Sequence, residues 1–396
     1  MLEWSEELTE YQELIRKFVT TELAPLREQL ELGDLSPYGV MRRFYTSFGI
    51  GESAKERFEA RQAGIPNSLP QRSAAETLIP MVEFSRFSPG IVTALGSSVS
   101  LTAGSILRNG TDEQKRRWAI DLLTLKTIGA WAITEPDSGS DAIGGMRSTA
   151  VADAEGWVLN GTKTFITNAP DADTIVFICK LNDGRPSRER QIMTFVLDKG
   201  MPGLVQGPPM RKMGLKSSPT GEISLNDVRV GSDRLLMHAD KASGSKGTKA
   251  TFATERASVV AMALGMIQQC LELSVEYAST RRQFGHSIGD FQLIQLKLAK
   301  MEVARLNVAN LLFRYVELVD GGRRPTLAEA SAMKLYAAQS TMEVALEAVQ
   351  VFGGNGYMTE NQVEQLCRDA KSLQIYGGTD EIQVTHVAKD LLGTMK

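Results

Sequence analysis

Cysteine and histidine are scarce in this sequence, and their scarcity limits the kinds of site that it can build. Three cysteines, Cys179, Cys270 and Cys367, are scattered over 396 residues. An odd, scattered set argues against a disulfide framework and fits a reducing compartment. No two of the three histidines have the close spacing of a metal site, so we expect no metal.

The chain also lacks an excess of charge and any long apolar run. Its 44 basic and 47 acidic residues give a net charge of −3, which leaves no positive excess for nucleic acid or an anionic membrane. The longest apolar run, Val259–Ile267, is far short of the roughly 18 residues of a membrane span. The acidic start Met1–Glu10 lacks the basic and apolar regions of a signal peptide. We therefore expect no membrane span, a small-molecule or protein partner, and a cytoplasmic or mitochondrial-matrix location.

Hydrophobic periodicity divides the chain, whose length suits two or three domains, into three regions. Helical spacing extends from residue 5 to about 123, and it returns near Thr251, after a Gly- and Lys-rich linker at 242–249. Between them, strand-like runs alternate with turn residues. The runs are Ile128–Ile133, Trp157–Leu159, Thr164–Thr167, Thr174–Cys179 and Ile192–Val196, and the turns are Asn160-Gly161, Asn182–Gly184 and Pro202-Gly203. We predict an α+β protein with a helical domain at 1–125, a β-domain at 126–240 and a helical domain at 241–396.

The C-terminal tail carries the most specific motifs. Gln350–Tyr357 reads Gln-Val-Phe-Gly-Gly-Asn-Gly-Tyr, and Arg368–Gln383 contains Gln-Ile-Tyr-Gly-Gly-Thr-Asp-Glu-Ile-Gln. This tail resembles the end of an acyl-CoA dehydrogenase. In much of that flavoprotein family the catalytic base is a Glu between the Ile-Tyr and the Gly-Thr, where this chain has Gly377. The isovaleryl-CoA and long-chain acyl-CoA dehydrogenases resemble it more, since they carry the base on an earlier helix, where this chain has Glu255.

Three further motifs are similar to those of the family. Trp131–Asp141 resembles its first signature, although Asp137-Ser138 departs from the usual small pair. Lys163–Asn168 resembles the strand behind the flavin, and Tyr277–Gln292 resembles the segment that binds its diphosphate. Taken alone, Lys163–Asn168 is also consistent with an ordinary strand that enters a turn. Tyr277–Gln292 is also consistent with a helix that ends in a basic turn. The resemblance implies an N-terminal helical domain, a β-barrel-like middle domain and a C-terminal four-helix bundle.

The resemblance also implies FAD as the cofactor, and site residues within these motifs. The implied FAD contacts are Ile133, Thr134, Gly139, Ser140, Phe165, Thr167, Arg281, Gln283, Phe284, Gln292, Gln350, Gly353, Gly354, Thr379 and Glu381. The implied substrate contacts are Ser140, Arg256 and Gly377. A guanidinium suits the diphosphate because its planar donors match phosphate oxygens. In the family the Arg281 motif serves a flavin held mainly by a neighbouring subunit, which implies a homotetramer.

Glu255 is the only carboxylate at a base position of the family. Steps of three or four residues along its helix meet only apolar residues and a cysteine. These residues are Val259, Met262, Ala263, Met266 and Cys270. A carboxylate on such a buried face has a raised pKa, which suits a general base. Alternatively, Glu255 is a first-turn residue favoured by the helix dipole, or it pairs with Arg256 or a nearby lysine. Gly377 favours the base, because it leaves room for a carboxylate and keeps an N–H that can polarise a thioester carbonyl.

The resemblance thus implies an FAD-dependent acyl-CoA dehydrogenase. Glu255 would remove the α-proton of an acyl-CoA as the β-hydride passes to flavin N5, giving the trans-2-enoyl-CoA. An electron-transfer flavoprotein would then accept the electrons. Three alternatives remain open. The enzyme could act on an acyl-carrier-protein thioester instead of acyl-CoA, or use oxygen as the electron acceptor. The chain could also be a non-catalytic flavoprotein subunit of a hetero-oligomer, or a helical scaffold without a cofactor. The sequence does not specify the acyl group of the substrate. Bulky acyl groups, such as steroid side chains, remain among the candidates.

Overall fold

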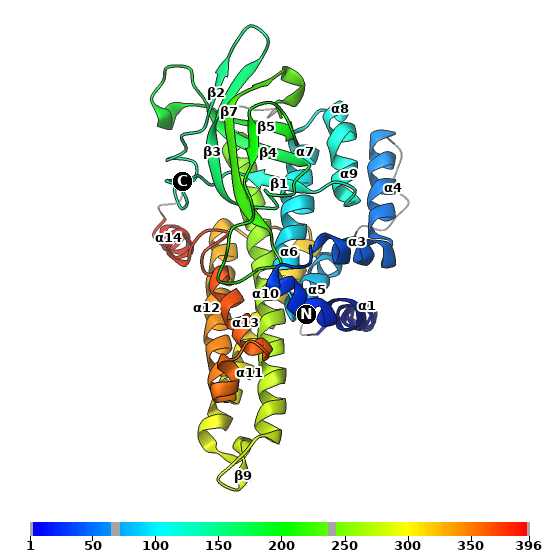
Figure 1. The fold of residues 1–396 in the computed structure, drawn as a ribbon, viewed down its shortest axis with the longest axis vertical. Coiled ribbons are helices and arrows are strands. Elements are labelled where there is room, and N and C mark those ends of the chain that lie inside the picture. Colours follow the sequence, from blue (N-terminus) through cyan, green and yellow to red (C-terminus); the bar gives the residue numbers. More distant parts are fainter. Residues whose placement is uncertain (1–2, 65–71, 237–242, 394–396) are drawn as a thin grey trace.

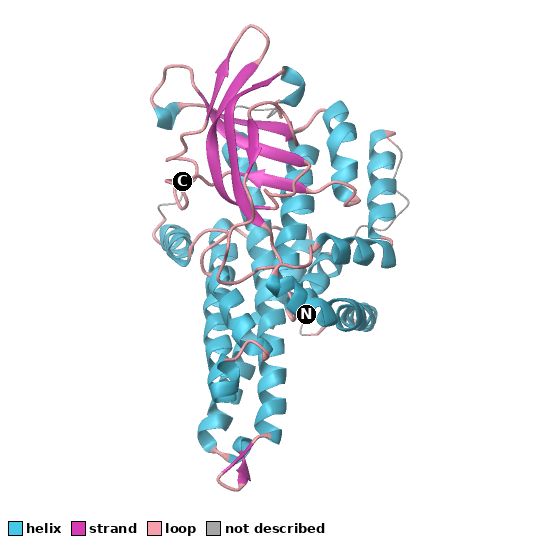
Figure 2. Cartoon of the chain, viewed as in Figure 1, coloured by secondary structure: helices cyan, strands magenta, loops and turns pink. Residues whose placement is uncertain are grey.

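The structure, a computed structural model, describes residues 3–64, 72–236 and 243–393, with only the backbone described at 243–254. Helices begin and end the chain, and the strands lie between them (Figures 1 and 2). The sheet lies at one end of the molecule, and the long C-terminal helices extend to the other, where strand β9 (His286–Ser287) forms the tip (Figure 1). The predicted order of helices, strands and helices is confirmed.

The N-terminal region is helical, and polar side chains at several helix starts explain where its helices begin. Ser73 and Glu76 form a reciprocal capping box at the start of α5, and Thr111 and Gln114 form another at α8. The α-helices are α1 (Glu6–Phe18), α2 (Arg27–Leu32), α3 (Tyr38–Ser47), α4 (Ile50–Gln62), α5 (Ala74–Ser85), α6 (Pro89–Leu95), α7 (Gly104–Asn109), α8 (Asp112–Gln114) and α9 (Ile120–Leu123). Segments of π-helix join several of them, at Val19–Leu23, Gly96–Ala103 and Lys115–Ala119.

The middle region forms a seven-stranded mixed sheet. Its strands are β1 (Gly129–Ala132), β2 (Thr149–Ala152), β3 (Trp157–Thr167), β4 (Thr174–Leu181), β5 (Ile192–Asp198), β6 (Leu204–Gln206) and β7 (Thr220–Val230). Hydrogen bonding follows the order β1-β4-β2-β3-β7-β6, with β5 also paired to β4. The pairings of the described strands form an open path, so closure of the expected barrel-like domain is not shown.

The turn predicted at Asn160-Gly161 is wrong, because these residues lie inside the continuous strand β3. The pairing of β3 with β7 shifts register between Leu159 and Gly161, as at a β-bulge. A Cβ at Gly161 would lie 2.2 Å from Ser148 Oγ, so the glycine permits the close approach of β2. The Asn-Gly pair therefore marks an irregularity within a strand and not a hairpin.

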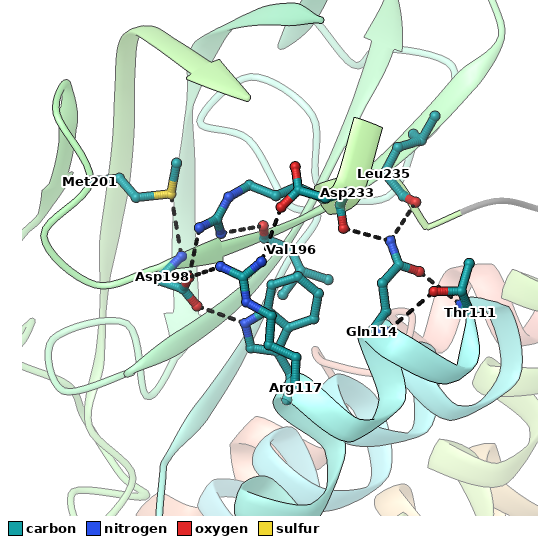
Figure 3. Close-up of polar contacts among 10 residues, drawn as sticks. Thr111, Gln114, Arg117, Val196, Asp198, Met201, Asp233 and Leu235 are labelled. Atoms are coloured by element: carbon teal, nitrogen blue, oxygen red, sulfur yellow. Dashed lines mark hydrogen bonds and ion pairs between the residues drawn. The ribbon is translucent and has the colours of Figure 1, made fainter. Parts of the chain in front are cut away.

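Polar contacts join the N-terminal helices to the sheet at the segment around α8 (Figure 3). The indole N–H of Trp118 donates to Asp198 at 2.8 Å, and the guanidinium of Arg117 donates to Asp233 at 3.0 Å. Gln114 donates from its side-chain amide to the carbonyl oxygens of Asp233 and Leu235. These bonds fix the edge of the sheet against the helical region, far from the C-terminal tail.

The C-terminal region packs as a helical bundle around α10 and α12. Its helices are α10 (Ser243–Thr280), α11 (Gln292–Asp320), α12 (Leu327–Phe352), α13 (Gln362–Leu373) and α14 (Asp380–Leu391). Helix α10 packs on α5, α11, α12 and α13, and α14 packs on α12. The predicted start of α10 near Thr251 is wrong, since the helix begins at Ser243 and replaces most of the predicted linker; Ala242 lies outside the described residues.

Two helical stretches are long and apolar enough to cross a membrane by length and composition alone. They are Pro89–Asn109 and Glu255–Thr280. Of their most apolar windows, 56% and 67% are buried within the protein. Both stretches are core helices of this fold, so their composition is weak evidence for a membrane span.

Candidate active site

Glu255 lies twelve residues inside α10, on the face that packs against the rest of the protein. The apolar residues expected on its face are all buried, with exposures of 0–2%. They are Val259, Met262, Ala263, Met266 and Cys270. Because the effect of a helix dipole is confined to the first turn, the alternative of Glu255 as a dipole-stabilised first-turn residue is excluded. Among the side chains that the structure describes, Glu255 forms no close ion pair, and the pairing alternative is supported only by the longer-range effect of the Arg256 and Lys334 charges.

Burial of the Glu255 carboxyl group is the main influence on its charge. Desolvation raises the pKa of Glu255 to about 7, while the cations of Arg256 and Lys334 oppose this rise. A carboxyl group with a pKa near neutrality is half ionised at physiological pH. It can therefore accept a proton as a base and remain weakly solvated.

The Gly377–Gly378 turn lies directly against the Glu255 carboxyl group. Both glycines have left-handed backbones, with φ of +65° and +90°. A Cβ built on Gly377 would lie 3.7 Å from the Glu255 carboxyl carbon. A longer side chain at Gly377 would therefore be strained in its backbone, and it would extend from beside the carboxyl group. The absence of a side chain at Gly377 thus leaves space for the Glu255 carboxyl group, as the sequence suggested.

The two carbonyl groups of this turn are held by buried side chains. Gln383 donates from Nε2 to the Gly377 oxygen at 3.1 Å and to the Gly378 oxygen at 2.7 Å. Lys334 donates from Nζ to the Gly378 oxygen at 2.9 Å. Within the described part of the chain, the Gly377 N–H donates no hydrogen bond. The turn thus has satisfied acceptors and a free donor beside a carboxylate.

Arg256 is buried beneath the turn and joins α10 to two other helices. Its Nη1 donates to Ser331 Oγ at 3.0 Å, and its Nη2 lies 3.3 Å from His386 Nδ1. Desolvation lowers the pKa of Arg256 to about 10, and the neighbouring Glu255 opposes this shift. The guanidinium therefore bonds to side chains of α12 and α14. Its expected contact with a thioester stays a prediction.

The first signature and the strand β3 are joined by a buried ion pair that the sequence analysis missed. Lys163 donates from Nζ to Glu135 Oε1 at 2.8 Å and to the Ile133 oxygen at 3.0 Å, and its side chain has no exposure. The Glu135 carboxylate also accepts from the backbone N–H groups of Arg147 and Ser148. The pattern of apolar residues in a strand does not predict a buried lysine. Only Glu135, the opposite charge in the neighbouring motif, could have suggested this ion pair.

These contacts bring several of the predicted flavin contacts together at the face of the sheet. The Thr164 N–H donates to the Thr134 oxygen at 2.9 Å, which places the first signature beside β3. Phe165 sits at a register shift with φ of +57°, and its ring is 68% exposed. Ile133 is buried, Thr134 and Thr167 are partly exposed, and Gly139 and Ser140 are exposed. A strained backbone beneath an exposed aromatic ring is typical of functional sites.

A second group of predicted flavin contacts gathers at the opposite end of α10. The hairpin β8 (Arg282–Gln283) and β9 follows the helix, and Phe284 at its tip is 89% exposed with φ of +54°. The Tyr277 ring stacks on Phe352 at 4.1 Å, and Asn355 donates to the Tyr277 hydroxyl at 2.9 Å. These contacts bring the Gly353–Tyr357 segment beside the hairpin. The exposed residues gathered here are Arg281, Gln283, Phe284, Gln292, Gln350, Gly353 and Gly354.

The length of α10 separates the two groups within one chain. Residues Glu255–Thr280 are continuous helix, and the 25 steps between them, at 1.5 Å each, span about 38 Å. Thr379 and Glu381, at the start of α14, lie with the Glu255 group. One chain therefore does not bring Arg281 and Glu255 to the same small site. The predicted contacts can share a cofactor only if neighbouring chains contribute them.

Family models cover nearly the whole chain. Acyl-CoA dehydrogenase N-terminal, middle and C-terminal domains match residues 5–126, 130–228 and 242–392. The chain belongs to the acyl-CoA dehydrogenase family, whose members are flavoproteins.

Individual relatives cover most of the chain. The human mitochondrial short-chain specific acyl-CoA dehydrogenase is 33% identical, over 95% of this chain and 88% of that protein. The CarC subunit of the caffeyl-CoA reductase-Etf complex of Acetobacterium woodii is 37% identical, over 80% of this chain and 82% of that protein. The solved butyryl-CoA dehydrogenase of Megasphaera elsdenii matches with a TM-score of 0.87 and 31% identity, over 99% and 100% of the two chains.

Proposed function

We propose that this protein is an FAD-dependent acyl-CoA dehydrogenase that forms a trans-2-enoyl-CoA, with Glu255 as the catalytic base. The observation that carries the proposal is the desolvated carboxyl group of the partly buried Glu255, which lies beside Gly377, whose N–H is free among the described residues. A base and an adjacent donor are the two groups needed to remove a proton next to a thioester carbonyl. The named dehydrogenases among its relatives support the same reaction class.

The residues present fit a flavin dinucleotide. Arg281 and Gln283 are exposed, and their side chains make no hydrogen bond or ion pair within the described residues, so these donors are available for a diphosphate. A Cβ on Gly139 would meet nothing within 4 Å, so there is open space around this residue of the first signature. FAD, when bound, would supply the acceptor for the hydride and its two electrons.

The residues of this chain would handle the proton and the carbonyl oxygen. The Glu255 carboxylate accepts the α-proton, and the N–H of Gly377 donates to the thioester oxygen, where negative charge develops in the transition state. The turn keeps this geometry because its own carbonyl groups are already bonded to Gln383 and Lys334. The apolar face around Glu255 excludes water from the reacting atoms.

A homotetramer would complete the cofactor site. The separation along α10 supports an arrangement in which the Arg281 hairpin would serve a flavin on a neighbouring chain. Large apolar side chains are exposed on α11 and α12, as expected of a surface that is covered in an assembly. They are Leu293, Leu296, Val303, Leu306, Tyr336 and Leu346.

An electron-transfer flavoprotein is the proposed electron acceptor. The support is a relative named as a subunit of a reductase-Etf complex. Because that relative is named as part of a caffeyl-CoA reductase, the reverse direction is a second candidate, in which Glu255 would return the proton instead of removing it. Anaerobic flavin bleaching by saturated acyl-CoAs, compared with reoxidation of reduced flavin by enoyl-CoAs, distinguishes the two directions.

The experiment that tests the proposal is a substrate panel on purified, flavin-loaded protein. Butyryl-, isovaleryl-, octanoyl- and 3-phenylpropionyl-CoA are mixed with it without oxygen, and loss of flavin absorbance is followed. At least one thioester should bleach the flavin, and the same acyl group on a carrier protein should do so more slowly. Protein that purifies without flavin, or that no thioester bleaches in either direction, contradicts the proposal.

A further inference from the structure

Lys334 is a fully buried lysine behind the Gly377–Gly378 turn. It lies in the first half of α12, and its side chain has no exposure. Its ammonium group donates to the Gly378 oxygen at 2.9 Å and pairs with Asp380 Oδ1 at 3.3 Å. Burial of a charged group is costly even when it is paired. An apolar residue would pack α12 at lower cost, so the lysine indicates a function.

The first consequence of these contacts is geometric. The backbone of both glycines is left-handed, and glycine has many other conformations available. Lys334 and Gln383 hold the Gly378 oxygen from α12 and α14, respectively. The turn is thereby kept in the conformation that places Gly377 beside the Glu255 carboxyl group.

The second consequence is electrostatic. The positive charges of Arg256, on the same helix, and of Lys334, on α12, both lower the pKa of Glu255 and so favour its ionised form. Asp380 partly neutralises Lys334 through their ion pair. Other titratable groups around these charges, from the tail and α14, include Tyr376, His386 and Glu381, whose pKa is lowered mainly by hydrogen bonds, with Lys334 as a smaller cause. Since desolvation raises the pKa of Tyr376, it is neutral here, and among the described side chains Lys334 is the cation from another element that acts on Glu255.

We propose that Lys334 is a positioning residue for the dehydrogenation: it holds the Gly377–Gly378 turn, and its charge keeps the Glu255 carboxylate ionised for proton transfer. This inference rests on the proposed function, because it assigns Lys334 a part in the chemistry of Glu255. Lys334 itself touches neither substrate nor cofactor in this proposal. It acts through the turn and through the field at the carboxylate.

Three variants of the full flavin-loaded protein separate these effects. Lys334→Gln keeps a donor toward the turn but removes the charge, Lys334→Met removes both, and Asp380→Asn removes the opposing charge. Flavin bleaching by the fastest acyl-CoA of the panel is measured across about pH 6 to 9. Loss of the cation should raise the midpoint of the rate by about one pH unit or more, whereas Asp380→Asn should lower it.

The magnitudes of the rates provide a second criterion. Lys334→Gln should lose about tenfold in rate at neutral pH and approach the wild-type rate at high pH, with KM little changed. Lys334→Met should also lose rate on the plateau, up to about 10²-fold, because the turn is displaced. A merely structural residue would lower rate and melting temperature together without opposite pH shifts in the lysine and aspartate variants.

A binding measurement provides a readout that does not depend on turnover. Acetoacetyl-CoA has an acidic α-proton, and its enolate gives a long-wavelength charge-transfer band against oxidised flavin. The pH at which this band appears should rise in Lys334→Gln and fall in Asp380→Asn, as for the midpoint of the rate. Unchanged midpoints in both assays overturn the proposal, and Lys334→Gln decides it if Lys334→Met fails to fold. Wild-type protein that turns over no thioester would instead refute the proposed function, while the acetoacetyl-CoA titration still tests the charge effect.

Discussion

Replacing Glu255 by Gln removes the proposed base but keeps the size and polarity of its side chain. An amide cannot accept the α-proton, so flavin bleaching should fall by about 10²–10⁴-fold, the usual contribution of general-base catalysis. Flavin content and binding of acyl-CoA should remain close to wild type, because the N–H of Gly377 and the cofactor contacts are unaltered. In the wild type, the rate should rise about tenfold per pH unit below pH 7 and level off above it, as Glu255, with its pKa of about 7, ionises.

The same substitution should also increase stability at alkaline pH. The pKa of Glu255 is raised from 4.5 to about 7 on folding, so the native state holds its proton more tightly than the unfolded chain. Stability therefore falls as pH rises from 4.5 through 7, and the ionised carboxylate costs about 3 kcal/mol above that range. Gln avoids this cost, so the variant should gain stability at pH 8 and little at pH 5.

Stopped-flow bleaching without oxygen and urea unfolding at the two pH values measure these effects. Glu276→Gln is the matched control, because Glu276 is an exposed glutamate on the same helix; it should change neither quantity. Near-normal bleaching in the Glu255 variant would refute the base assignment. Loss of bleaching with no gain in stability at pH 8 would refute the argument from desolvation.

Other substitutions test the remaining parts of the structure. Arg281→Ala should weaken retention of FAD and shift the assembly toward smaller species, as measured by flavin absorbance and light scattering; unchanged values would remove its assigned role. Gly265→Ala should destabilise the protein by about 1–3 kcal/mol, since a Cβ there would lie 2.0 Å from the Val82 oxygen. Gly96→Ala is its control, with open space around the added carbon, and should be neutral or stabilising in thermal unfolding. Lys163→Met should cost about 3–5 kcal/mol in urea unfolding because it leaves a buried carboxylate unpaired; a smaller loss would show that water or relaxation compensates.

Periodicity predicted the order of the regions well, because burial imposes it directly. The short apolar runs Thr174–Cys179 and Ile192–Val196 correspond to β4 and β5, and the helical spacing corresponds to the bundle. The errors come from residues whose local preference was overridden by tertiary contacts. Asn160-Gly161 is typical of a hairpin turn, yet close approach of β2 makes it a bulge within β3.

The candidate site was predicted in part, because its motifs are short and local. The proximity of Glu255 and Gly377 was inferred from a missing side chain, and their contact in the structure supports it. The sequence did not predict the roles of Lys334 and Gln383. Nothing in it shows that Lys334 bonds to a turn some 40 residues later, or that Gln383, on the helix after the turn, bonds back to it. Buried polar contacts of this kind depend on tertiary packing, and a single sequence carries no signal for them.

The distance between the two ends of α10 predicts that defects in different chains can compensate each other. In a mixed assembly, a Glu255→Gln chain can contribute its hairpin to a partner, and an Arg281→Ala chain can contribute its carboxylate. If chains mix randomly, about a quarter of the sites combine an intact base with an intact hairpin. Two variants that are each impaired alone would thus regain activity when refolded together, so that the functional unit is defined by the contact between chains and not by any one of them.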